Sequence, residues 1–206
     1  MHTLRFLSVC ALVSIGCHSV PCMGQEIIRI EEDWELHVIQ PDAKRDAPQV
    51  TTTAFPLGSN SSLLFQFDLN HASLPDFASG GMQIRICDDD CLLDQKRLFD
   101  GIKLDNDGET VSWTQVFHNT ADGYYFGISR GSSSSFGGFG DHTTFAYISH
   151  QEAGDDDLDD YRYADSIDDS GVAFAGNRVG HLRLKKVRAY VVGGLLWEKT
   201  LNVDVK

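Results

Sequence analysis

The chain has 206 residues, of which 42% are hydrophobic, and its 30 acidic against 17 basic residues give a formal net charge of −13 at pH 7. A surface this acidic repels phosphate backbones, which argues against a nucleic-acid partner. The length suits one domain of ordinary size with a sizeable core.

Residues 1–24 have the layout of a secretory signal peptide. Arg5 precedes an apolar run over residues 6–15, which is too short to span a bilayer, and Gly24 places a small residue before Gln25. We therefore expect cleavage between Gly24 and Gln25.

Cleavage there leaves residues 25–206 as a single domain that is secreted or lies in the periplasm or at the cell surface. The alternative is a lipoprotein signal with acylation at Cys17, because the sequence SIGC places a small residue before that cysteine. No second hydrophobic stretch follows, so we expect no transmembrane segment.

Only Cys87 and Cys91 remain after removal of this segment, in a setting that is oxidising. They flank three aspartates in ICDDDCL. If the aspartates form a hairpin turn, the cysteines face each other at a separation that a disulfide can bridge, and we predict that bond. A metal site is the alternative, although two thiolates without a nearby histidine supply half of a zinc site.

Apolar side chains alternate with polar ones in short segments along the rest of the chain, which is the period of a half-buried strand. The segments are centred on residues 28–38, 63–69, 82–86, 111–117, 124–128 and 145–147, and turn-forming residues lie between them. About ten short strands at this spacing, without a segment of helical period, predict an all-β antiparallel sandwich or barrel.

The C-terminal stretch predicts a hairpin with Gly193-Gly194 in its turn. This register pairs Leu184 with Val203 on an apolar face and Arg183 with Asp204 on the other. It also pairs Val192 with Leu195, Tyr190 with Trp197 and Leu182 with Val205. Three cations, Lys186, Arg188 and Lys199, then fall within the apolar face. Either the hairpin twists away from the core there, or these cations meet carboxylates from elsewhere.

Charge is unevenly distributed along the chain. Residues 178–206 carry seven basic and two acidic residues, whereas residues 151–171 carry nine acidic residues around a single arginine. The acidic stretch is typical of a solvated loop. The alternative is a calcium site, because calcium takes about six to eight oxygen ligands from carboxylates and carbonyls in irregular loops. Its ligands would be Asp155, Asp156, Asp157, Asp159 and Asp160.

The stretch RGSSSSFGGFGDH, residues 130–142, is typical of a long mobile connection at the rim of a sandwich, where binding sites often lie.

The closing stretch resembles the final strands of concanavalin A-like lectin and glucanase sandwiches. The resemblance rests on Leu182, Leu184, Val187, Arg188 and Tyr190 with the following Gly turn, and it covers about a seventh of the chain. It implies a β-sandwich of the concanavalin A-like or jelly-roll type.

Glucanases of that superfamily carry E-x-D-x-E on one strand, which maps here to Glu31, Asp33 and Glu35. The resemblance would make Glu31 a nucleophile and Glu35 an acid/base. However, the motif lies close to the expected mature N-terminus and has Glu32 in its first gap. Alternation alone places the three carboxylates on one face opposite apolar residues, so we interpret them as the solvated face of a strand.

These features lead us to expect a secreted, non-catalytic module that binds carbohydrate or another envelope component through its rim loops. The alternative is a structural component of an extracellular or cell-surface assembly, in which the basic hairpin of one copy meets the acidic stretch of the next. Such charge-driven self-association would weaken as ionic strength rises.

Overall fold

The computed structural model describes residues 25–39, 48–59, 61–70, 80–89, 91–99, 101–104, 106–140, 146–149, 157–174 and 176–205. The predicted signal peptide, its cleavage after Gly24 and the alternative acylation at Cys17 lie outside these residues.

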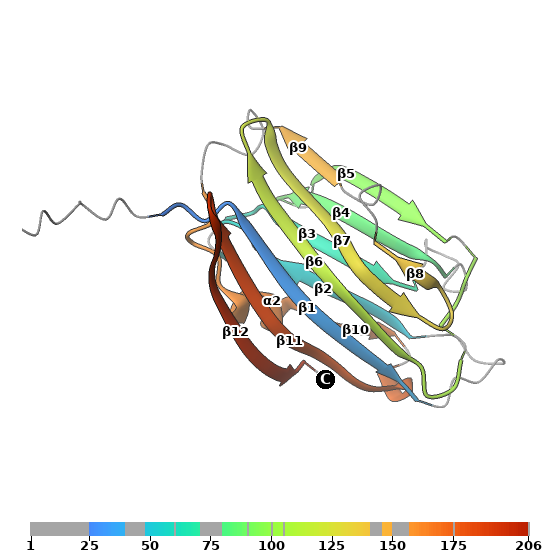
Figure 1. Cartoon of the computed structure of the whole chain (residues 1–206). Coiled ribbons are helices and arrows are strands. Elements are labelled where there is room, and N and C mark those ends of the chain that lie inside the picture. The colour runs from blue at the N-terminus through green and yellow to red at the C-terminus, as the bar shows by residue number, and fades with distance from the viewer. Residues whose placement is uncertain are drawn as a thin grey trace, which may run out of the picture.

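Two antiparallel sheets make up the described structure, as the alternation predicted (Figure 1). The first sheet has seven strands in the order β12-β11-β1-β6-β7-β8, with β9 also paired to β7. The second has five strands in the order β10-β2-β3-β4-β5. The strands of the first sheet are β1 (Arg29–Val38), β6 (Thr110–Thr120), β7 (Gly123–Ser133), β8 (Gly137–Phe139), β9 (Ala146–Ser149), β11 (Val179–Val191) and β12 (Gly194–Asp204). Those of the second are β2 (Gln49–Ala54), β3 (Leu64–Leu69), β4 (Met82–Asp88), β5 (Cys91–Leu98) and β10 (Gly171–Phe174).

The core lies between the two sheets and is rich in aromatic side chains. Phe65 of β3 stacks on Phe126 of β7 with ring centroids 5.1 Å apart, and Trp34 of β1 stacks on Trp113 of β6 at 6.5 Å. The apolar side chains that the alternation predicted to be buried in β3, β4, β6 and β7, and just before β3, are buried: Leu63, Phe65, Phe67, Leu69, Met82, Ile84, Ile86, Val111, Trp113, Phe117, Tyr124, Phe126 and Ile128. One face of each sheet is therefore apolar and closes the sandwich.

The C-terminal hairpin keeps the predicted register at its open end only. Leu184 pairs with Val203 and Arg183 with Asp204, as expected, but near the turn Val191 pairs with Gly194, which moves the turn by one residue. Two register shifts separate these ends, one between Leu184 and Lys186 and one between Ala189 and Tyr190. Each β-bulge adds a residue to one strand, and beyond it the residues that face the core change from odd-numbered to even-numbered positions or the reverse.

The predicted disulfide is not formed in the structure. Cys87 and Cys91 do lie on the two strands of the β4–β5 hairpin, but Cys87 stands opposite Leu92 and Cys91 opposite Asp88. Because Asp88 already belongs to the ladder, the turn does not contain all three aspartates, and the cysteines are diagonal rather than opposite neighbours.

Residues 131–139 form a hairpin rather than the predicted mobile connection. Gly131 pairs with Phe139, and Glu109 accepts hydrogen bonds from Ser133 and from the backbone N–H of Ser135, the latter at 2.8 Å. Phe136 is buried and packs beside Phe139. A Cβ at position 131 would lie 2.2 Å from the Phe139 ring, which explains the glycine there.

The acidic stretch is anchored to the sandwich in its described part. Leu158 is completely buried and Tyr161 nearly so, and both belong to the core. A short helix, α2 (Tyr163–Asp169), follows, and a 3₁₀ turn, η2 (Gly176–Arg178), leads into β11. The alternation did not predict α2, whose seven residues are too few to show a helical period.

Candidate ligand site on the seven-stranded sheet

The carboxylates of β1 lie on the outer face of the seven-stranded sheet and are held there by cations from neighbouring strands. Arg188 of β11 donates from Nη1 to Oδ2 of Asp33 at 2.8 Å and from Nη2 to Oδ1 at 2.6 Å. Its Nε also donates to Oε2 of Glu31 at 2.9 Å. One guanidinium therefore joins two of the three acidic residues in the predicted motif.

Two further arginines complete the shell around Glu31. Arg130 of β7 donates from Nη2 to Oε2 of Glu31 at 2.7 Å, and Arg29 donates from Nη2 to Oε1 at 2.5 Å. Glu31 is consequently only 4% exposed although it points away from the core. The prediction that Glu31 lies on the face away from the core is confirmed. The prediction that this face is solvated is wrong for Glu31, because arginines cover its carboxylate.

Glu35, two residues after Asp33 on β1, has its own basic partners. Lys185 donates from Nζ to Oε2 at 2.7 Å, and Nε2 of His181 lies 3.2 Å from Oε1. The expectation that cations of the C-terminal hairpin meet carboxylates from elsewhere is confirmed for Arg188, which meets β1. Lys186 instead meets a carboxylate within the hairpin, that of Glu198 on β12, at 3.0 Å.

Contacts with basic groups lower the pKa of all three carboxyls. Burial opposes ionisation of Glu31 and Asp33, but hydrogen bonds and charges from the arginines outweigh it and lower each pKa. For Glu35 the hydrogen bond from Lys185 is the main cause of its lowered pKa. A glycosidase needs one carboxylic acid with a raised pKa beside an ionised partner. None of the three carboxyls of this motif has the raised pKa that such an acid requires.

Glu32, the residue that breaks the alternation, faces the core. Its carboxylate accepts hydrogen bonds from Nε1 of Trp34 at 2.9 Å, Nε2 of Gln115 at 2.9 Å and the hydroxyl of Tyr161 at 2.6 Å. Burial is the largest effect on this carboxyl and raises its pKa. Glu32 has no exposed surface, so it links the acidic segment to β1 rather than facing a substrate.

Backbone irregularities in three strand pairs lie along one line across the outer face. The register shifts between Asp33 and Trp34 in the β1–β11 pair and between Ser112 and Thr114 in the β6–β7 pair. The β11–β12 shift between Leu184 and Lys186 continues the same line. Beside these shifts, Arg130 and Asn202 adopt left-handed backbone conformations, with φ of 53° and 55°.

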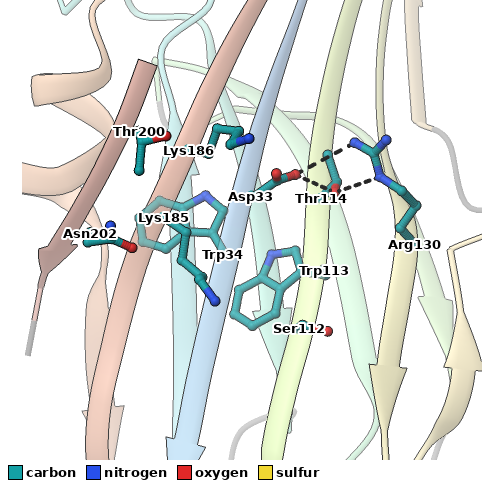
Figure 2. A pocket seen from close by; sticks show the side chains of 10 residues that line it. All are labelled: Asp33, Trp34, Ser112, Trp113, Thr114, Arg130, Lys185, Lys186, Thr200 and Asn202. Carbon is teal, nitrogen blue, oxygen red and sulfur yellow. Dashed lines mark hydrogen bonds and ion pairs between the residues drawn. The ribbon is translucent and has the colours of Figure 1, made fainter. Parts of the chain in front are cut away.

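A pocket of about 320 Å³ lies over this line (Figure 2). Eight polar side chains from five strands line it: Asp33, Ser112, Thr114, Arg130, Lys185, Lys186, Thr200 and Asn202. In Figure 2, Asp33, Thr114 and Arg130 form a connected chain across β1, β6 and β7. The pocket thus offers hydrogen-bond donors and acceptors, and those of Asp33, Thr114 and Arg130 are held in place by hydrogen bonds to one another.

A second hollow of about 400 Å³ lies at the end of the sheet where the β6–β7 and β11–β12 turns meet. Its lining is Glu26, Ile28, His118, Asn119, Thr120, Ala121 and Val192, of which only Glu26 and His118 are ionisable. Burial and the charge of Arg29 lower the pKa of His118, which favours its neutral form. We therefore take the pocket over Asp33 as the candidate site.

Of the predicted calcium ligands, Asp157, Asp159 and Asp160 are described and do not line this pocket, whereas Asp155 and Asp156 fall outside the described residues. Asp159 accepts a hydrogen bond from the backbone N–H of Ile27 at 2.8 Å, and Asp157 accepts one from the N–H of Asp159 at 2.8 Å. Asp160 faces Arg162 at 3.7 Å. Calcium binding stays a prediction, and a site there would raise the melting temperature in millimolar calcium relative to chelator.

Comparison with known protein families, with curated proteins and with solved structures finds no match for this chain. No helix in the described part of the chain is long and apolar enough to cross a membrane.

Sequence reasoning missed Arg130, Thr200 and Asn202 as members of the site. Their placement depends on the bulges, which strict alternation does not reveal. For Arg130 there was a local signal, because an isolated Gly131 within a strand-like run is typical of a bulge.

Proposed function

We propose that this protein is a secreted, non-catalytic β-sandwich module that binds carbohydrate on the outer face of its seven-stranded sheet. The observation that carries the proposal is the line of bulges, which brings eight polar side chains from five strands around one pocket. Bulges are common next to functional sites, where they redirect side chains.

The chemistry of the lining suits a sugar. Each sugar hydroxyl both donates and accepts hydrogen bonds, and the pocket presents carboxylate and hydroxyl acceptors beside guanidinium and ammonium donors. Its volume of about 320 Å³ lies in the range of small-molecule sites. The resemblance to concanavalin A-like sandwiches supports the same ligand class by analogy.

This proposal moves the binding site from the rim loops, where the sequence placed it, to the sheet. The described part of the predicted rim loop is tied down by the β7–β8 hairpin and by Phe136. The sheet face, in contrast, carries the exposed polar groups that a ligand could contact.

A glycan array probed with the wild type and one filled-pocket variant tests the proposal. Ser112→Phe places a large ring in the pocket at a strand position, and Gln66→Phe on β3 of the five-stranded sheet is the control. We expect glycan binding by the wild type and by Gln66→Phe, and its loss in Ser112→Phe. Absence of binding to every glycan, or equal binding by all three proteins, would contradict the proposal.

The assembly hypothesis is the second candidate, and exposed apolar side chains at the β11–β12 turn favour it. Val192 is 83% exposed and Leu195 53% exposed. Its charge-driven form has less support, because Arg183, Lys185, Lys186 and Arg188 already pair with acids of the same chain. Size-exclusion chromatography at two salt concentrations separates the candidates, because a binding module elutes as a monomer at both.

A further inference from the structure

We infer that the ligand of the sheet pocket is an anionic saccharide, one that bears carboxylate or sulfate groups, and that Arg130 and Lys185 bind its charge. This inference rests on the proposed function and adds the chemical class of the ligand.

The acids and bases of this face are unequally exposed. The side chains of Glu31, Asp33 and Glu35 are 5%, 28% and 19% exposed. Those of Arg130 and Lys185, which line the pocket above them, are 59% and 43% exposed. An incoming ligand therefore meets cationic groups first, although every cation has an acidic partner below it.

The charged groups around the pocket also carry a net positive charge. Five cations, Arg29, Arg130, Lys185, Lys186 and Arg188, are in ion pairs with four acids, Glu31, Asp33, Glu35 and Glu198. The described cluster thus carries a net charge of +1, from five minus four, on a chain whose formal net charge is −13. A basic surface in this setting is a local feature that attracts anions.

The backbone supplies a second, independent observation. Arg130 has a φ of 53°, a conformation that costs a non-glycine residue energy and that persists when the surroundings enforce it. Lys185 is the extra residue of the β11 bulge opposite Asp33 and Trp34. Both cations therefore reach the pocket through irregular backbone positions, and strain of this kind concentrates at ligand sites.

Both cations retain hydrogen-bonding capacity for a ligand. Among the described residues Arg130 donates through Nε to Thr114 and through Nη2 to Glu31, which leaves Nη1 for an anion. Lys185 uses one of its three N–H donors on Glu35. Charge-assisted hydrogen bonds from these donors are stronger than those to neutral hydroxyls, so an anionic sugar binds in preference to a neutral one.

Dextran, dextran sulfate and alginate provide the probes, because they are neutral, sulfated and carboxylated polysaccharides. The Kd of the wild type for each is measured at physiological salt. Arg130→Asn removes the guanidinium but keeps a residue type that tolerates the left-handed conformation. Lys185→Gln removes an exposed charge, and Lys96→Gln on β5 of the five-stranded sheet is the control with the same change of charge.

We expect binding to dextran sulfate or alginate that is at least about tenfold tighter than to dextran, and a loss of about tenfold in Arg130→Asn and in Lys185→Gln. Lys96→Gln should stay within about twofold of the wild type. Whichever of dextran sulfate and alginate binds more tightly identifies the charged group of the ligand as sulfate or carboxylate. Circular dichroism confirms folding, and Lys185→Gln carries the test if Arg130→Asn does not fold.

Equal affinity for dextran and the two anionic polymers would overturn the inference while leaving the proposed function intact. An equal loss of affinity in Lys96→Gln would also overturn it, because binding would then be unspecific ion exchange. Absence of binding to both anionic polymers would overturn it as well. The proposed function would fall with it only if the glycan array showed no binding, or equal binding by the wild type, Ser112→Phe and Gln66→Phe.

Discussion

Arg188 binds Asp33 through two parallel hydrogen bonds of 2.6 and 2.8 Å, and its side chain is only 12% exposed. The pair joins the penultimate strand of the chain to the first described strand, since Asp33 lies on β1 and Arg188 on β11. Fork geometry of this kind is specific to arginine and fixes the carboxylate under the pocket.

Replacement of Arg188 by Met should cost about 2–3 kcal/mol of unfolding free energy, because it leaves Asp33 and Glu31 without their main buried partner. Urea denaturation measures the loss. The double variant with Asp33→Asn should lose less than the sum of the two single losses. Strict additivity would show that the two side chains do not interact as the structure has them.

The buried carboxyl of Glu32 should make stability fall as pH rises. Burial raises its pKa in the folded protein above the ordinary glutamate value of 4.5. The folded state therefore binds this proton more tightly than the unfolded state. The contribution of Glu32 to the free energy of unfolding is fully present below pH 4.5 and is lost as pH rises through the folded-state pKa.

Glu32→Gln removes this titration and keeps the shape of the side chain. Its stability relative to the wild type should therefore increase with pH, as measured by urea midpoints at several pH values above 4.5. The difference in unfolding free energy between the two proteins cancels the pH dependence that the other carboxyls contribute to both. A difference that is constant with pH would mean that Glu32 is ionised in the folded protein at all of these values.

Leu158 should anchor the acidic segment. Leu158→Ala removes a completely buried side chain and should cost about 3 kcal/mol. Asp160→Ala, two residues further on and largely exposed, should change stability by less than about 0.5 kcal/mol. Thermal and urea unfolding measure both. Equal effects of the two substitutions would indicate a loop that does not pack on the core.

The fold was largely predictable because alternation directly shows which face of a strand is buried. This worked for β3, β4, β6 and β7, because the core residues of each of these strands are either all odd-numbered or all even-numbered. It failed in β11, where Leu182 and Leu184 face the core but so do Val187 and Ala189. The parity changes at the bulge around Lys185, and a bulge leaves no periodic signal in the sequence.

The candidate site was predictable only in part. Glu31, Asp33 and Glu35 were placed on one face, and the unexplained cations of the hairpin pointed to acidic partners. Lys199 behaves differently, because it stays on the inner face and lies over the Tyr163 ring of α2, with its Nζ 4.6 Å from the ring centroid. Pairings of this kind depend on tertiary packing and not on spacing along the chain.

Mapping the bound ligand on the protein is the most direct test of the central claim, that the outer face of the seven-stranded sheet is a saccharide site. Amide chemical shifts are recorded by NMR during titration with the glycan that the array selects. We expect the largest changes around Asp33, Thr114, Arg130, Lys185 and Thr200, where five strands meet at the bulges. Changes confined to the five-stranded sheet or to the turns at the rim would contradict the account.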